Sequence, residues 1–214
     1  MTATNNTTSA PSAAPALRRD VLLAADALNL PNCITVSRLF LSFVLFAMIS
    51  WGGMWIWSAV LFAAAAATDA VDGYLARRYG MVTTLGRILD PFVDKIIVCG
   101  AFIFLLAARD PSGAVQSGIG PWMTLIVIGR EIFITGLRSI LEQQGKDFSA
   151  SLSGKIKMVT QCAAVAASLL SMSTVFKSPS FDGFRDALLW LAVIFTVVSG
   201  ILYVRRAARL LRLP

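Results

Sequence analysis

Six apolar segments follow one another along the chain, and each is close to the length of about 20 residues that crosses a lipid bilayer as a helix. Turn residues separate them, with Trp51-Gly52-Gly53 after the first segment and a stretch rich in Gly, Pro and Ser at 109–121 after the third. The second segment continues as a polar helical extension to Arg78. The pattern predicts an all-α membrane protein with six transmembrane helices, at about 34–50, 54–68, 88–108, 122–141, 158–176 and 187–204.

The residues before the first segment have a different character. Residues 1–16 consist of Thr, Ala, Ser, Asn and Pro apart from the initial Met, without charge or periodicity, and we expect this tail to be disordered. Residues 17–29 contain the sequence RRDVLLAADAL, which is typical of a short amphipathic helix in the membrane interface. Residues 30–214 then form one six-helix membrane domain.

Composition and charge support the membrane interpretation. Hydrophobic residues make up 57% of the 214 residues and charged residues only 14%, whereas a soluble domain has about a quarter charged. This excludes an ordinary soluble globule and argues against a nucleic-acid-binding protein. Six crossings put both termini on one side, and the other side receives only Arg109, Lys177 and Arg185 of the 19 basic residues. Because basic residues collect on the cytoplasmic side, both termini are predicted to be cytoplasmic.

Four aspartates mark the predicted cytoplasmic ends of the second and third segments: Asp69, Asp72, Asp90 and Asp94. The first two are spaced i, i+3 and the last two i, i+4, so each pair projects from one helical face. Four neighbouring carboxylates repel one another unless cations lie between them. Because the chain has no histidine, oxygen ligands alone favour Mg²⁺ first and Mn²⁺ second. The alternative is that nearby Arg and Lys side chains pair with these carboxylates, which explains the charge balance but not the spacing.

The residues between the two pairs suit a phosphorylated substrate. Gly73 and Ala76 leave room for a bulky group beside the helix, and Gly86 is a further small residue. Arg77 offers a planar fork that matches phosphate oxygens. Metal ions and an arginine beside a small-residue groove are what a pyrophosphate-containing substrate needs.

The complete pattern, D-x2-D-G-x2-A-R-x8-G-x3-D-x3-D over residues 69–94, resembles the signature of the CDP-alcohol phosphotransferase family. The resemblance implies a metal-dependent membrane enzyme, usually dimeric, that transfers a phosphatidyl or related group from a CDP-linked donor to an alcohol. It also implies that the four aspartates bind two Mg²⁺ or Mn²⁺ ions and that Asp94 is the general base. The residues implied at the CDP group are Asp69, Asp72, Gly73, Ala76, Arg77 and Gly86.

Further motifs resemble the bacterial phosphatidylglycerophosphate synthases within that family. They are Leu30-Pro31-Asn32-x2-Thr35-x2-Arg38, Gly129-Arg130-Glu131 with Arg138, and Gly154-Lys155-x-Lys157-x3-Gln161. Met158 departs from the subfamily, which commonly has Thr there. The resemblance implies CDP-diacylglycerol as donor, bound also by Asn32, Thr35 and Arg38, and sn-glycerol 3-phosphate as acceptor. It makes residues 30–214 the catalytic domain of an enzyme of the bacterial inner membrane.

A second cluster of charge favours an anionic acceptor. Its cations are Arg130, Arg138 and Lys155. Cations in otherwise apolar helices repel one another unless an anion joins them, and a phosphate monoester meets that need. Glu131 either orients one of the arginines or simply neutralises it. The alternative is that the cations are positive-inside anchors, an interpretation that suits Lys146 and Lys157 better than Arg130.

Two other functions compete with this interpretation. A divalent-cation transporter would also bind metal through aspartates, but it would hold them near the middle of the membrane in broken helices. An enzyme of the same family would keep the metal site and use another acceptor, namely inositol phosphate, serine or phosphatidylglycerol.

Overall fold

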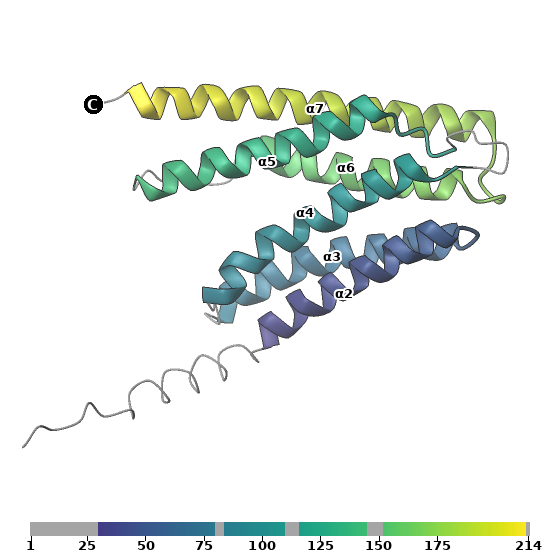
Figure 1. Cartoon of the computed structure of the whole chain (residues 1–214), viewed down its shortest axis with the longest axis horizontal. Coiled ribbons are helices and arrows are strands. Elements are labelled where there is room, and N and C mark those ends of the chain that lie inside the picture. Colours follow the sequence, from purple (N-terminus) through teal and green to yellow (C-terminus); the bar gives the residue numbers. More distant parts are fainter. Residues whose placement is uncertain (1–29, 80–83, 110–115, 145–151, 213–214) are drawn as a thin grey trace, which may run out of the picture.

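The structure, a computed structural model, describes residues 30–79, 84–109, 116–144 and 152–212. These residues form six long α-helices that run side by side, and within these ranges there is no β-strand (Figure 1). The predicted all-α architecture is confirmed for this part of the chain. The tail 1–16 and the interfacial helix 17–29 lie outside the described residues. The helices are α2 (Leu30–Trp51), α3 (Trp55–Tyr79), α4 (Thr84–Ala107), α5 (Pro121–Gln143), α6 (Leu152–Ser171) and α7 (Pro179–Arg212).

Several helix boundaries follow directly from local sequence. Gly52 and Gly53 adopt φ values of 71° and 82° between α2 and α3, a region that glycine enters without steric cost. Pro121 is the first residue of α5, where its missing N–H removes no intrahelical bond. The polar extension of the second segment is confirmed, because α3 continues through its aspartates to Tyr79.

The fifth and sixth segments have different limits from those predicted. Helix α6 ends at Ser171 rather than near 176, because the Ser173 hydroxyl accepts a hydrogen bond from the backbone N–H of Val175 at 3.2 Å and stabilises a turn. Helix α7 begins at Pro179 rather than near 187. The Ser178 hydroxyl accepts the N–H of Phe181 at 3.2 Å and so caps the first turn of α7.

The core lies where α2, α4 and α6 meet their neighbours. Helix α6 packs against α3, α4 and α7, while α2 packs against α3 and α4. Gly100 of α4 allows α2 to come close, since a Cβ added there would lie 2.1 Å from Cζ of Phe46. The Phe46 ring stacks on Phe104, with ring centroids 4.8 Å apart. A larger residue at Gly100 would therefore force these two helices apart.

One end of the bundle carries the predicted site. Helix α3 ends and α4 begins at this end, where α6 also begins and α5 and α7 terminate (Figure 1). Only residues 80–83 connect Tyr79 to Thr84, so these two helix ends lie within about 17 Å of each other.

The opposite end is held by Arg185, whose side chain is buried among neighbours from three segments. Its Nη1 atom donates to the carbonyl oxygen of Gln116 at 3.0 Å, to Ser171 Oγ at 3.2 Å and to Asp182 Oδ1 at 2.9 Å. Its Nε atom donates to Asp186 Oδ1 at 2.9 Å. The sequence identified this arginine only as a charge on the less basic side. In the structure it fastens the segment before α5 and the end of α6 to the start of α7.

The apolar lengths of the helices support a membrane protein. Among the described residues, one stretch, Pro179–Leu210, is long and apolar enough to cross a bilayer by itself. Shorter apolar helical stretches occupy Val36–Trp51, Trp55–Thr68 and Lys95–Ala107. Crossing of the bilayer by the six helices remains a prediction.

Candidate functional site

The predicted metal ligands occupy two helices that meet at one end of the bundle. Asp69 and Asp72 lie near the end of α3, and Asp90 and Asp94 lie in the first half of α4. Their side chains are outside the described residues, and so are the surroundings of the predicted donor residues Asn32, Thr35, Gly73, Ala76, Arg77 and Gly86. The described side chains include no cluster of three or more metal-binding groups. The backbone thus places both pairs at the same end, and their coordination of metal remains a prediction.

Arg38 is the one predicted donor residue whose side chain the structure describes. It lies in α2 and is only 3% exposed. Its backbone carbonyl accepts a hydrogen bond from the Ser42 hydroxyl at 2.8 Å. Burial of an arginine near the start of an apolar helix is costly, so Arg38 does not serve as a surface anchor.

Arg130 lies in α5 and reaches toward α7. Its side chain is 12% exposed. Nη1 donates to Glu131 Oε1 at 3.1 Å, and Nη2 donates to Ser199 Oγ at 3.3 Å. The guanidinium lies over the ring of Tyr203, 5.5 Å from its centroid. Side chains from α5 and α7 therefore hold this cation at one position, and its Nε atom is buried without a hydrogen-bond partner in the described part of the chain.

The three cations predicted to bind the acceptor differ in burial. Arg138 is half-buried about two turns beyond Arg130 on α5, and Lys155 is exposed on the first turns of α6. A second buried cation, which shares an ion-pair partner with Arg130, is Lys157; it is 6% exposed. Its Nζ atom forms an ion pair with Glu131 Oε1, the same oxygen that accepts from Arg130.

Lys157 was therefore missed by an interpretation that treated it as an anchor. The sequence contained no local signal for its burial; in the structure Lys157 shares a helical face with Gln161, Ala164 and Ser168, all of which are buried. Two residues separated by one position point to different sides of a helix, so Lys155 and Lys157 cannot both face inward. The burial of Gln161, Ala164 and Ser168 identifies the Lys157 face as the buried one.

A second polar link lies one turn from Lys157. Gln161 is 1% exposed, and its Nε2 atom donates to Thr196 Oγ1 on α7 at 2.8 Å. The Thr196 hydroxyl donates in turn to the carbonyl oxygen of Ala192 at 2.6 Å. This uncharged link joins α6 to α7, whereas the charged link joins α6 to α5.

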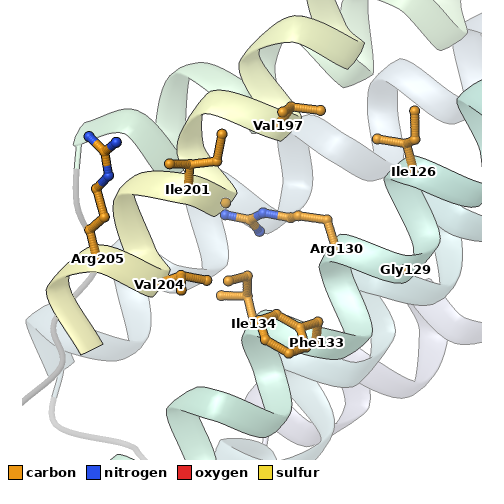
Figure 2. Close-up of a pocket in the computed structure, with 10 residues that line it drawn as sticks. Ile126, Gly129, Arg130, Phe133, Ile134, Val197, Ile201, Val204 and Arg205 are labelled. Carbon is orange, nitrogen blue, oxygen red and sulfur yellow. The ribbon is translucent and has the colours of Figure 1, made fainter. Parts of the chain in front are cut away.

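An open groove of about 470 Å³ runs between α5 and α7 beside Arg130. Gly129 and Gly200 contribute no side chains to its walls, which are otherwise mostly apolar. Figure 2 shows the Arg130 side chain extending from α5 toward Ile201 and Val204, while Arg205 points away from it.

The sequence matches the family described as CDP-alcohol phosphatidyltransferase over residues 28–198, a range that includes every predicted site residue. The chain belongs to this family. It is 40% identical to the CDP-diacylglycerol–glycerol-3-phosphate 3-phosphatidyltransferase of Bacillus subtilis, over 80% of this chain and 91% of that protein. It is 30% identical to the protein of the same name from Rickettsia bellii, over 82% of this chain and 93% of that protein. The family generally depends on divalent metal ions.

Proposed function

We propose that this protein transfers the phosphatidyl group of CDP-diacylglycerol to sn-glycerol 3-phosphate, giving phosphatidylglycerophosphate and CMP. The observation that carries the proposal is the 40% identity to the Bacillus subtilis enzyme over most of both chains. The motif across residues 69–94 supports it, because all eight positions of the family pattern are present.

The donor and the metal ions bind at the joined ends of α3 and α4. The four aspartates would hold two Mg²⁺ or Mn²⁺ ions, which would supply positive charge against the pyrophosphate and the departing CMP. Arg77 and the buried Arg38 add positive charge for the phosphates, while Gly73 and Ala76 leave space for the CDP group. The four carboxylates suit Mg²⁺ or Mn²⁺ chemically, since hard cations prefer oxygen ligands.

The reaction is a displacement at phosphorus. A hydroxyl oxygen of the acceptor forms a bond to the β-phosphorus of the donor, and the bond from that phosphorus to the bridging oxygen breaks. CMP leaves with the electron pair of the broken bond. Asp94 accepts the proton of the attacking hydroxyl, which keeps the nucleophile from carrying positive charge as the new bond forms.

The acceptor phosphate binds to the cations of α5 and α6, with Arg130, Arg138 and Lys155 as its partners. Support comes from the burial of Arg130 in a helix that is otherwise mostly apolar, where an anionic ligand offsets the cost of the charge. Serine or free inositol would leave these cations without compensation.

The protein functions as an integral membrane enzyme of the bacterial inner membrane, as a homodimer with six helices crossing the bilayer. Both termini and the site end of the bundle face the cytoplasm, where the water-soluble acceptor is available. The excess of basic residues at this end supports the orientation.

The decisive experiment is CMP release by purified protein in detergent–lipid micelles containing CDP-diacylglycerol and Mg²⁺. We expect release with sn-glycerol 3-phosphate and little with inositol phosphate, serine, phosphatidylglycerol or free glycerol. Preference for another acceptor would reject the acceptor assignment and retain the family chemistry. Absence of CMP release with every acceptor would reject the proposed transferase activity.

A further inference from the structure

We propose that Glu131 is a positioning residue, which holds Arg130 and Lys157 as a preassembled pair of cations for the acceptor phosphate. The inference rests on the proposed function and deepens it by assigning roles to Glu131 and Lys157. Its basis is that one carboxylate oxygen, Glu131 Oε1, accepts from Arg130 Nη1 at 3.1 Å and also from Lys157 Nζ. A single atom thus fixes cations from two helices relative to each other.

Without the carboxylate, the two cations would not stay together. Both are largely buried, with exposed side-chain fractions of 12% for Arg130 and 8% for Lys157, so water screens their repulsion poorly. Glu131 is itself buried, and it precedes the exposed face of α5 formed by Ile132 and Phe133. With only 10% of its side chain exposed, the carboxylate has little contact with water and stays paired with the two cations.

The ion-pair network around Glu131 carries a net positive charge and therefore favours binding of an anion. Its described members, Arg130, Glu131 and Lys157, comprise two cations and one carboxylate. Ser199 and Tyr203 of α7 fix the other side of the guanidinium but bring no charge. One positive charge is left over, and the buried Nε of Arg130 has no partner among the described residues. A doubly negative phosphate compensates such a site better than a neutral alcohol.

A purely structural link of similar burial lies close by and serves as a control. Gln161 and Thr196 connect α6 to α7 through a 2.8 Å hydrogen bond, and within the described part of the chain neither side chain hydrogen-bonds to Arg130 or Lys157. Loss of that bond weakens helix packing without altering the charges at Arg130. Comparison of the two links therefore separates positioning of the cations from general stability of the bundle.

The test measures KM for sn-glycerol 3-phosphate and for CDP-diacylglycerol in the full-length protein, together with its thermal midpoint in detergent. For Glu131→Gln we expect the acceptor KM to rise about tenfold or more, while the donor KM stays within about twofold. Glu131→Asp keeps the charge on a shorter side chain and should recover part of the loss. Thr196→Val should lower the thermal midpoint and leave the ratio of the two KM values unchanged.

A double variant keeps the test decisive if Glu131→Gln fails to fold. Glu131→Gln combined with Lys157→Gln removes one charge of each sign, so the network keeps its net charge and no new unpaired carboxylate is created. The inference requires the same selective rise in acceptor KM. An unchanged acceptor KM, or an equal rise in both KM values, would overturn it. Absence of glycerol-3-phosphate-dependent CMP release by the wild-type protein would instead reject the proposed function.

Discussion

Lys157 of α6 and Glu131 of α5 form an ion pair between two helices, and both side chains are almost completely buried. Lys155 lies two residues away on the same helix and is exposed. The two lysines therefore differ in environment although they share a sequence motif, and this difference allows direct comparison of matched variants.

The first prediction concerns stability. Lys157→Met leaves the buried Glu131 with one cation fewer, and we expect it to destabilise the protein by about 3 kcal/mol, the low end for a broken buried pair. Lys155→Met removes an exposed charge and should change stability by no more than about 0.5 kcal/mol. Thermal unfolding in detergent measures both. Equal effects of the two substitutions would contradict the placement of Lys157.

The second prediction concerns the metal site. Asp69→Ala, Asp72→Ala and Asp90→Ala should each remove nearly all activity in a folded protein, because no neighbouring group replaces the lost negative charge at the metal ions. Asp94→Ala should lower kcat by about 10²- to 10⁴-fold, the range for a lost general base. EDTA should abolish CMP release and Mg²⁺ or Mn²⁺ should restore it. Normal turnover of the Asp69, Asp72 or Asp90 variant would reject a dinuclear site.

The third prediction concerns the acceptor pocket. Removal of one charge-assisted contact costs about 1.5–3 kcal/mol, which corresponds to roughly ten- to a hundredfold in KM. We expect Arg130→Ala, Arg138→Ala or Lys155→Ala to raise the KM for sn-glycerol 3-phosphate by this factor and to change that for CDP-diacylglycerol much less. Steady-state kinetics with each substrate varied in turn provide the measurement. Use of free glycerol as readily as glycerol 3-phosphate would exclude a phosphate pocket.

The fourth prediction concerns the hydrogen-bond network of Arg185 at the other end of the bundle. Gly118 has φ of 73°, and a Cβ there would lie 2.5 Å from Arg185 Nε. Gly53 has a similar φ of 82° but open space around it. Gly53→Ala therefore carries backbone strain alone, about 1–2 kcal/mol, whereas Gly118→Ala also displaces the arginine. The thermal midpoint of Gly118→Ala should be the lower of the two. Equal midpoints would show that Arg185 can move without loss of stability.

The fifth prediction concerns orientation in the membrane. In a variant whose native cysteines are replaced, Lys177→Cys between α6 and α7 should react with an impermeant thiol reagent added to intact cells. Gln144→Cys at the other end of the bundle should react only after the cells are opened, because basic residues retain that end in the cytoplasm. Both positions are exposed, so accessibility within the protein does not distinguish them. The reverse labelling pattern would invert the topology.

The local character of the chain was readable from the sequence. Apolar runs, paired glycines and prolines predicted the helices and several of their limits, since these depend on neighbouring residues. The aspartate spacing and the small residues between the two pairs likewise identified the family, because this pattern lies within a short stretch of chain.

Tertiary structure alone decided which charges meet. Whether Lys155 or Lys157 faces the core depends on how α6 is rotated against α5 and α7, and that rotation results from packing along the whole helix. The hydrogen bonds of Arg185 likewise join residues up to 69 positions apart, a separation that no local sequence pattern covers. The sequence by itself determined the helices and the family, since short-range spacing encodes them. The partners of each buried cation were determined by the packing of helices that are distant in the chain.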